Sequence, residues 1–371
     1  MDATDLVSTS NFHATLLPGT RASAEAVGDP HSTGTHSIVL LAVAQVRSCV
    51  EVSVLTSVTH SLLLYSECSL NCREEDNEDA LPEHICRLQQ TDLFSIVVDN
   101  DGVTLFVDPN GVAMFDAAKM QDKIRTAPQT WRAIQIHLGP MVAEFPGVVS
   151  FLSKLLAEDN ISILNMSTYD TDIIYVQEDK LDQAVDCLRR KLSRGVTGLK
   201  ADKDAECELR LSIDDPLDLK TVVESGQYLA VYPASMVLVR LKKDALRDSA
   251  FGLTQLVLRS QGGAHAFWCY CETGEEISLI VDEECLVAFS ESAVIVSPDR
   301  WRVIKLCGRT YNFDETGVVA AMSALNSVNT QVLNISSFGA NVTLVLDDAL
   351  DESVASLCAS LNLTRVDRLL P

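Results

Sequence analysis

The sequence predicts an α+β protein built from tandem ferredoxin-like βαββαβ units, with two duplicated halves related by a pseudo-two-fold axis. Two observations lead to this prediction. Short stretches with strand periodicity alternate with short stretches that have helix periodicity. In addition, Trp131-Arg132-Ala133-Ile134 recurs as Trp301-Arg302-Val303-Ile304, at an offset of 301 − 131 = 170 residues.

The repeat continues in register along each half. Gly147–Val149 recurs as Gly317–Val319, Leu164–Ser167 as Leu333–Ser336, and Val176–Asp179 as Val345–Asp348, at offsets of 170, 169 and 169 residues. Earlier in each half, the apolar strand pattern of Ser95–Asp99 resembles that of Ser278–Asp282. Because four matches in register, at offsets of 169 or 170 residues, are not expected by chance, we interpret the chain as a tandem duplication.

Each copy is predicted to run strand, helix, strand, strand, helix. In the first copy, Trp131–Leu138 has strand character, and Phe145–Glu158 repeats apolar residues at helical spacing. Ile161–Met166 and Asp172–Val176 are then predicted strands around a polar turn, and Leu181–Leu192 is the second predicted helix. A final strand completes each unit, at Glu208–Ile213 in the first copy and Leu363–Val366 in the second. Two such units can join their sheet edges, which leaves fewer edges exposed.

The predicted domain organisation follows from the repeat. Residues 1–35 are expected to form a disordered N-terminal extension, because Ser, Thr, Ala, Gly and Pro dominate there without periodicity. Residues 214–228 contain turn-forming residues and are expected to link the two halves. The four units are predicted at residues 36–127, 128–213, 229–298 and 299–371.

The composition excludes several classes of function. The chain has 29 Lys plus Arg against 52 Asp plus Glu, a net charge of −23. It therefore has no basic surplus for nucleic acid or for an anionic membrane surface. The 11 Cys residues lack the paired spacing of a zinc site, and no apolar stretch is long enough for a membrane helix. No basic segment typical of a secretory signal opens the sequence, so we expect a cytoplasmic protein.

No sequence motif supports catalysis. The chain contains no Gly-x-Ser-x-Gly, no P-loop, no His-Glu-x-x-His and no Gly-rich dinucleotide loop after a strand. We therefore expect a protein that is not an enzyme, with no catalytic residue, no cofactor and no metal.

The loop between the first strand and the first helix of the second copy is the best candidate for a binding site. Asp314, Glu315 and Thr316 occupy positions where N-capping residues are common, and Gly317 lets another backbone approach closely. The free N–H groups of a helix N-terminus suit a carboxylate, and adjacent acids suit an ammonium or guanidinium group. These features fit a zwitterionic amino acid, and ordinary capping of a helix is the alternative interpretation.

Two segments, Asn160–Asp172 and Phe313–Ala320, resemble the CASTOR family of ACT-domain proteins. The resemblance covers most of residues 91–365 and is strongest in the two repeat copies. Members of this family are cytosolic arginine sensors that hold the TOR growth-kinase pathway in check through the GATOR complex. The resemblance implies four tandem ACT domains, arginine bound between the second and the fourth, and a homodimer as in the animal members.

Matched residue by residue, the resemblance also implies a ligand site. It consists of Ser162 and Ile163 from a strand of the second unit, Glu315, Thr316, Gly317 and Val319 from the loop and helix start of the fourth, and Ser337 and Phe338 from the hairpin beside the ligand. Asn341 stands where the family has an aspartate that pairs with the positive charge of the ligand, and an amide brings no charge. Three interpretations stay open: Glu315 or Asp314 compensates, the ligand is another amino acid, or Asn341 is an ordinary turn residue.

The resemblance further implies a partner-binding surface. Tyr169, Thr171 and Asp172 match the surface through which the family binds GATOR, and Asp170 replaces its glutamine. An exposed aromatic residue beside acids suits a protein contact, whereas a β-turn that closes the hairpin is the alternative. The long Ser/Pro-rich linker of the animal members is missing between the second and third units, and the N-terminal extension also differs.

The function expected from the sequence is that of a non-catalytic amino-acid sensor, with arginine as the first candidate ligand. It would regulate TOR-pathway signalling through a ligand-dependent contact with a GATOR-like complex. One alternative is an ACT-type allosteric module that binds another amino acid and acts on a metabolic enzyme. The other is a scaffold without ligand, in which Tyr311, Phe313 or Phe338 fills the cleft.

Overall fold

The computed structural model describes residues 37–41, 47–54, 61–65, 93–107, 112–113, 124–137, 148–191, 222–259, 266–274, 276–325, 328 and 330–370. The predicted N-terminal extension and the predicted strand Glu208–Ile213 lie outside the described residues, as does most of the predicted linker.

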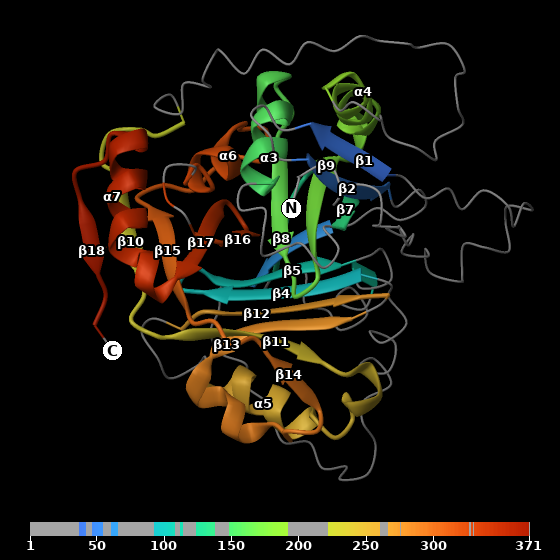
Figure 1. Cartoon of the computed structure of the whole chain (residues 1–371), viewed down its shortest axis with the longest axis vertical. Coiled ribbons are helices and arrows are strands. Elements are labelled where there is room, and N and C mark those ends of the chain that lie inside the picture. The colour runs from blue at the N-terminus through green and yellow to red at the C-terminus, as the bar shows by residue number, and fades with distance from the viewer. Residues whose placement is uncertain are drawn as a thin grey trace, which may run out of the picture.

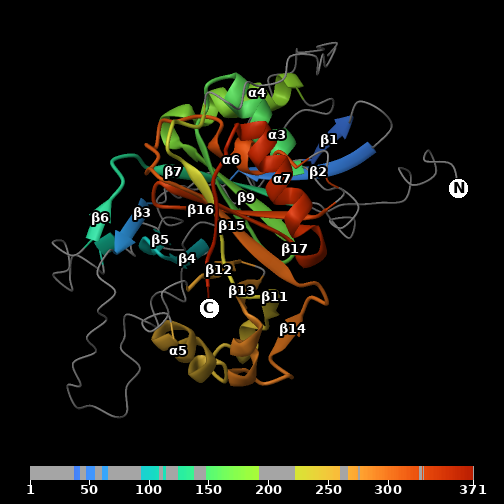
Figure 2. The same ribbon diagram turned by 90° about the vertical axis from the view of Figure 1, so that its left-hand side faces the viewer.

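The described elements form four layers (Figure 1). Helices cover the outer face of an upper stretch of β-sheet, a lower stretch lies beneath it, and another helix lies below the lower stretch. Figure 2 shows the upper helices side by side, with α5 at the opposite end of the molecule. The upper helices are α3 (Val148–Glu158), α4 (Leu181–Lys191), α6 (Val318–Met322) and α7 (Leu350–Leu361), and the lower helix is α5 (Ala250–Arg259).

The upper stretch of sheet joins the two repeat copies edge to edge. Its strands lie in the order β1-β2-β7-β9-β8-β16-β17-β15-β10-β18, and the copies meet where Met166 of β8 pairs with Ile335 of β16. All neighbouring strands of this stretch are antiparallel except β10 and β18, which are parallel. The strands are β1 (Ser37–Leu41), β2 (Arg47–Val54), β7 (Trp131–His137), β8 (Ile163–Ser167), β9 (Thr171–Gln177), β10 (Tyr228–Val231), β15 (Trp301–Cys307), β16 (Val332–Ser337), β17 (Ala340–Leu346) and β18 (Val366–Arg368).

The lower stretch has the order β6-β3-β5-β4-β12-β13-β11-β14 and is also joined at its centre. There β4 pairs antiparallel with β12, so each edge covers the other, as the sequence predicted. Among the described strands, the pairing of Met236 in β11 with Trp301 in β15 links the lower stretch to the upper one. The strands are β3 (Ser61–Tyr65), β4 (Leu93–Asp99), β5 (Gly102–Val107), β6 (Ile124–Thr126), β11 (Met236–Leu241), β12 (Trp268–Thr273), β13 (Ile277–Asp282) and β14 (Val294–Val296).

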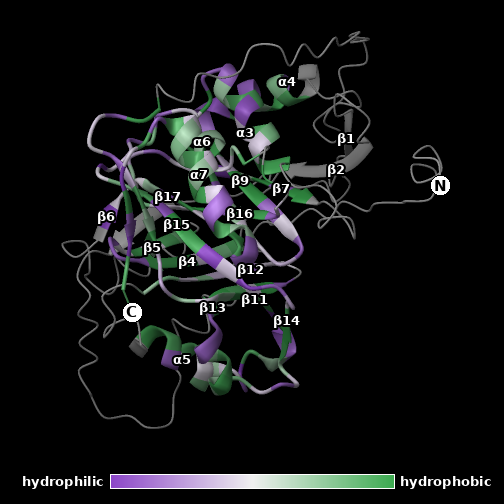
Figure 3. Ribbon diagram, turned by 60° about the vertical axis from the view of Figure 1, so that its left-hand side comes forward, coloured by the Kyte–Doolittle hydropathy of each residue, from purple (hydrophilic) through white to green (hydrophobic). Residues whose placement is uncertain are grey.

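The central core fills the space between the two stretches of sheet. The duplicated residues Trp131 and Trp301 are only 1% and 2% exposed there, so both copies contribute a large aromatic side chain to the same layer. Separate apolar clusters lie under α3 and α4, under α6 and α7, and under α5. Figure 3 shows the central strands β4, β7, β11 and β13 as predominantly hydrophobic, as expected for strands that pack on both faces.

Two details differ from the expectations. The last strand of the second copy is Val366–Arg368 rather than Leu363–Val366, and it pairs with β10, because β10 already occupies the edge of β15. Ser95–Asp99 and Ser278–Asp282 are not equivalent strands: β4 meets β12 at the centre of the lower stretch, whereas β13 takes the place of β5. Buried apolar strands have similar composition, so the local similarity misassigned this pair.

The predicted division into units stays a proposal. Strand β10, which begins at Tyr228 beside the predicted linker, hydrogen-bonds with β15 and β18 of the fourth unit.

Within the described residues, no helix is both long and apolar enough to cross a membrane. The same residues hold no group of three or more His, Cys, Asp or Glu side chains that could bind a metal ion.

Candidate functional site

A cavity lies where the two halves meet above the upper sheet. The space inside it and in its open mouth is about 330 Å³, of which only about 20 Å³ is enclosed. The wall combines the start of β8, the segment before α6, and the hairpin of β16 and β17. The lining residues are Ser162, Ile163, Leu164, Tyr311, Asn312, Phe313, Glu315, Val318, Val319, Ser336, Ser337, Gly339, Ala340 and Asn341.

Direct hydrogen bonds hold the two halves together at this cavity. The Ser162 hydroxyl donates to the backbone carbonyl of Glu315 at 2.9 Å, and the Gln177 side-chain amide donates to the carbonyl of Phe313 at 2.6 Å. Ser162 comes from the first copy and is 7% exposed. The structure therefore places Ser162 beside the segment that precedes Gly317, although 153 residues separate Ser162 from Glu315.

Six of the nine predicted ligand residues line the cavity, namely Ser162, Ile163, Glu315, Val319, Ser337 and Asn341. Thr316, Gly317 and Phe338 do not line it. Phe338 packs edge-on against Phe313, with ring centroids 4.9 Å apart, and the Arg125 guanidinium lies 4.7 Å from its ring centroid. Phe338 thus supports the wall from behind.

The sequence analysis missed several residues that line the cavity, including Leu164, Ser336, Gly339 and Ala340. A usable signal existed, because the repeat places the short turn of the β16–β17 hairpin at Phe338-Gly339. The Tyr311 amide donates to the carbonyl of Gly339 at 2.7 Å, which brings the hairpin against the loop before α6.

The predicted helix cap is built differently from the expectation. Helix α6 begins at Val318, its N-cap is Gly317 with φ 83°, and no side chain caps it. That backbone angle favours glycine, because other residues rarely adopt it. Glu315 instead accepts a hydrogen bond from the Asn312 amide, at 2.6 Å, and Asp314 is exposed. The acids therefore stabilise the loop rather than the helix end.

The Glu315 carboxylate also forms an ion pair with Arg309. The two guanidinium nitrogens lie 2.9 Å and 2.6 Å from the two carboxylate oxygens, a bidentate arrangement. Burial alone raises the pKa of the Glu315 carboxyl. The hydrogen bonds from Arg309 and from the Asn312 amide, with the charge of Arg309, outweigh that effect and hold the pKa below its ordinary value.

Asn341 is fully buried and belongs to a network of side-chain amides. Its amide nitrogen donates to Asn334 at 2.9 Å and to the Ser336 hydroxyl at 3.1 Å, and its oxygen accepts from Asn334 at 2.7 Å. The equivalent residue in the first copy is Asp172, since 341 − 172 = 169. Asn341 is therefore an ordered member of the cavity wall and not an exposed turn residue.

The aromatic residues narrow the cavity. Phe313 packs edge-on against Trp131, with ring centroids 6.0 Å apart, and against Phe338. Tyr311 and Phe313 contribute to the lining, so part of the cleft is filled as the scaffold alternative expected. Only about one water molecule fits in the enclosed part, so an amino acid needs these side chains to shift.

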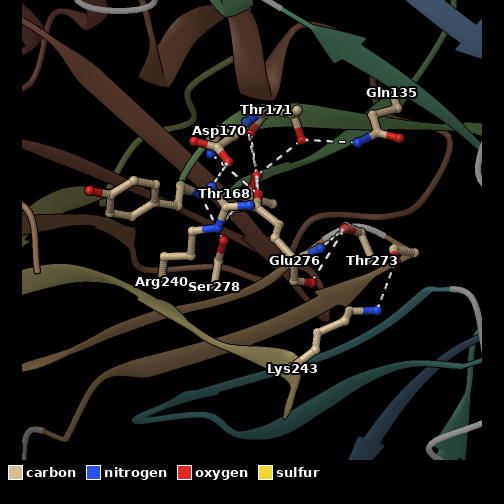
Figure 4. A network of polar contacts seen from close by, with 11 residues as sticks. Gln135, Thr168, Asp170, Thr171, Arg240, Lys243, Thr273, Glu276 and Ser278 are labelled. Carbon is tan, nitrogen blue, oxygen red and sulfur yellow. Dashed lines mark hydrogen bonds and ion pairs between the residues drawn. The ribbon is translucent and has the colours of Figure 1, made fainter. Parts of the chain in front are cut away.

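The turn from Thr168 to Asp172, the predicted partner surface, packs against strands β11 and β13 of the lower stretch (Figure 4). The Tyr169 amide donates to the Ser278 hydroxyl at 2.8 Å. Asp170 forms an ion pair with Arg240 at 2.8 Å, and its amide donates to the Glu276 carboxylate at 3.3 Å. Tyr169 and Asp170 are half-buried.

Asp172 is buried, unlike a contact residue on a free surface. It is 9% exposed and accepts a hydrogen bond from the Ser167 hydroxyl. Burial raises the pKa of Asp172 to about 6, although hydrogen bonds from Ser167 and Asn165 oppose the shift. In this arrangement Tyr169 and Asp170 are partly exposed, whereas the carboxylate of Asp172 is not.

Comparison with known proteins agrees with this architecture. Residues 126–190 and 296–359 match the ACT domain family model, and these segments contain β7 to α4 and β15 to α7. The predicted fold class of tandem ACT units is thereby confirmed.

Curated relatives support the resemblance seen in the sequence. The chain is 25% identical over 280 residues to the rat protein named cytosolic arginine sensor for mTORC1 subunit 1, covering 69% of this chain and 81% of the relative. The human protein of the same name is 23% identical over 298 residues, covering 73% and 87%. Among solved structures, aspartate kinase from Synechocystis is similar with a TM-score of 0.32 and 14% identity, covering 85% of this chain and 56% of that chain.

Proposed function

We propose that this protein is a non-catalytic amino-acid sensor that binds its ligand in the cavity between the two halves. The observation that carries the proposal is the hydrogen bond from Ser162 to Glu315, beside a cavity that both halves line. Relatives named as arginine sensors support a regulatory role rather than catalysis. Their names also support a cytoplasmic location.

The lining suits the α-carboxylate and α-ammonium groups that all amino acids share. The Ser162 and Ser337 hydroxyls already donate to the Glu315 carbonyl and to the Asp99 carboxylate, so their oxygens can accept hydrogen bonds from a ligand ammonium group. The backbone between Asn312 and Val319 contributes N–H groups on the side of a ligand carboxylate. A ligand that touches both halves shifts the population of their closed arrangement only by its higher affinity for that arrangement. Rearrangement of Tyr311 and Phe313 on binding is the local change that we expect.

Arginine is the first ligand to test, because the relatives are named for it. We propose that the ligand state controls TOR-pathway signalling through a GATOR-like complex, which would contact the turn around Tyr169 and Asp170. This turn connects β8 to β9, and β8 begins directly after Ser162, so a shift at the cavity has a short route to the turn. A homodimer, as in the animal members of the family, is part of the same proposal.

Calorimetry with the twenty common amino acids tests the ligand, and Ser162→Ala tests the site. Loss of one hydrogen bond should weaken binding by about 0.5–1.5 kcal/mol, or roughly two- to twelvefold. Ser360→Ala is the matched control, because this hydroxyl also donates to a backbone carbonyl, that of Leu357 on α7. Failure of every amino acid to bind would contradict the sensor proposal.

Affinity capture with and without the ligand tests the partner. We expect a GATOR-like complex whose capture changes with ligand and is lost on Tyr169→Ala. Stable capture of a metabolic enzyme instead would favour the allosteric module.

A further inference from the structure

We propose that Arg309 determines the ligand specificity of the cavity, by neutralising Glu315 and so removing the advantage of a positively charged ligand. The inference rests on the proposed function, since it names the class of amino acid that the cavity accepts. In the native protein, arginine should bind no better than an uncharged amino acid of the same shape.

The charge of the cavity wall is the first step of the argument. Among the described lining residues, Glu315 has the only carboxylate. Asp314, the other acid available to compensate for Asn341, is exposed and does not line the cavity. Within this described lining, attraction of a ligand cation by a full negative charge must therefore come from Glu315.

That carboxylate is already bound within the chain. Both of its oxygens face Arg309, at 2.9 Å and 2.6 Å, and one of them also accepts the Asn312 amide. A bidentate arginine–carboxylate pair is a strong, oriented contact. The pair carries no net charge, so it offers little attraction to a second guanidinium group.

Arg309 is held in place by further contacts. Its guanidinium lies 4.2 Å from the centroid of the Tyr311 ring, and it donates to Gln227 at 3.3 Å and to the carbonyl of Val222 at 3.2 Å. Gln227 in turn donates to the Tyr311 hydroxyl at 2.8 Å. Because Tyr311 also lines the cavity, the cation of Arg309 lies against two residues of the wall.

The far side of the wall does not replace the lost attraction. The oxygen of Asn341 already accepts a hydrogen bond from Asn334, and its nitrogen donates twice. A ligand cation would lose water without gaining an opposite charge, which is costly in a confined site. An uncharged ureido or amide group loses less hydration free energy when it moves from water into the cavity.

Arginine and citrulline are the probes, because they have similar shape and differ in charge. Calorimetry should give the native protein an arginine-to-citrulline affinity ratio near or below one. Arg309→Gln should raise this ratio by about tenfold, since it exposes the charge of Glu315. Arg309→Lys, which keeps the charge, should stay near the native ratio, and Arg309→Gln combined with Glu315→Gln should return to it.

Arg302→Gln is the matched control. It removes one positive charge from a residue that pairs with Asp347 and does not line the cavity, so the ratio should stay within about twofold of the native value. A ratio in Arg309→Gln equal to that in Arg302→Gln, with binding retained, overturns the inference and leaves the sensor proposal intact. If no amino acid binds to the native protein or to the Arg309 and Glu315 variants, both the sensor proposal and this inference are contradicted. Circular dichroism establishes that each variant is folded.

Discussion

The carboxyl group of Glu276, just before β13, holds the turn from Thr168 to Asp172 in place. It is 3% exposed and accepts hydrogen bonds from the Thr168 hydroxyl at 2.8 Å and from the Asp170 amide at 3.3 Å. Burial, and next the charge of Asp170, raise the pKa of Glu276 to about 7 from an ordinary value of 4.5. The guanidinium of Arg240 lies 3.9 Å away on the other side.

Because the folded-state pKa is raised, Glu276 contributes stability that is complete below pH 4.5 and is lost as the pH rises to about 7. Glu276→Gln should remove this loss and increase the free energy of unfolding at pH 8 by about 1–3 kcal/mol, with little change at pH 4. Urea titrations across this pH range measure the effect. Glu283→Gln is the control, because Glu283 is an exposed carboxyl whose pKa is lowered by Arg300. This variant should not reduce the loss of unfolding free energy between pH 4 and pH 8. A pH dependence in Glu276→Gln that matches the native protein contradicts the prediction.

Lys305 is a second buried charge, at the junction of the first and fourth units. It is 3% exposed, and its amine lies 2.9 Å from Asp99, the last residue of β4, and 2.6 Å from Asp101 in the turn that follows. Burial alone lowers the pKa of Lys305, but the two carboxylates outweigh it and raise the pKa above its ordinary value. The lysine therefore stays charged.

Lys305→Met should lower the free energy of unfolding by about 3–5 kcal/mol, because it leaves Asp99 buried without an opposite charge. Adding Asp99→Asn should recover much of that loss, since the uncompensated charge is then removed as well. Urea denaturation of the two single variants and the double variant measures the coupling. Additive losses in the double variant would argue that the ion pair does not hold these units together.

At the scale of elements, the two copies use different turns in equivalent hairpins. Gly339, in the turn between β16 and β17, has φ 75°, whereas the equivalent residue Asp170 has an ordinary negative φ. A side chain at residue 339 would place its Cβ 2.2 Å from the Thr310 methyl carbon and 3.0 Å from the Tyr311 carbonyl. The close approach lets the hairpin form the wall of the cavity.

Gly339→Ala should therefore destabilise the protein by more than the roughly 1–3 kcal/mol expected for backbone strain alone, and it should weaken ligand binding. Gly226→Ala is the matched control, because its φ is 94° but no atom lies within 4 Å of the added carbon. Thermal and urea unfolding compare the two variants. Equal losses would mean that the contact with Thr310 relaxes without cost.

At the scale of the whole molecule, two reciprocal hydrogen bonds cross the junction of β8 and β16. The Asn165 amide donates to the Ser336 hydroxyl at 2.9 Å, and the Asn334 amide donates to the Ser167 hydroxyl at 3.0 Å. All four residues are buried, and the two bonds are related by the repeat. These two bonds join the halves symmetrically, whereas the nearby cavity is lined by different segments of the two copies.

Ser167→Ala and Ser336→Ala should each cost about 1–3 kcal/mol, because each leaves a buried backbone amide without its acceptor. Only Ser336→Ala should also change ligand affinity, since Ser336 lines the cavity and Ser167 does not. Denaturation and calorimetry on both variants test this separation. Equal effects on binding would show that the junction, rather than the wall, controls the ligand.

Local patterns were sufficient to predict the repeated elements. The predicted helices Phe145–Glu158 and Leu181–Leu192 correspond to α3 (Val148–Glu158) and α4 (Leu181–Lys191), because apolar residues at helical spacing form one buried face in any globular context. The family resemblance, rather than the repeat, implied that Ser162 and the loop before Gly317 would meet.

The rest depended on contacts between residues far apart in the sequence. Nothing local to Arg309 indicates that it binds Glu315, nothing local to Asp172 indicates burial, and the place of β10 between β15 and β18 follows from which sheet edge is free. The sequence by itself determined the duplicated α+β units, because periodicity and repetition can be read from the order of residues along the chain. Only the tertiary structure decided the charge of the cavity, because burial and ion pairing arise when distant segments exclude water from one another.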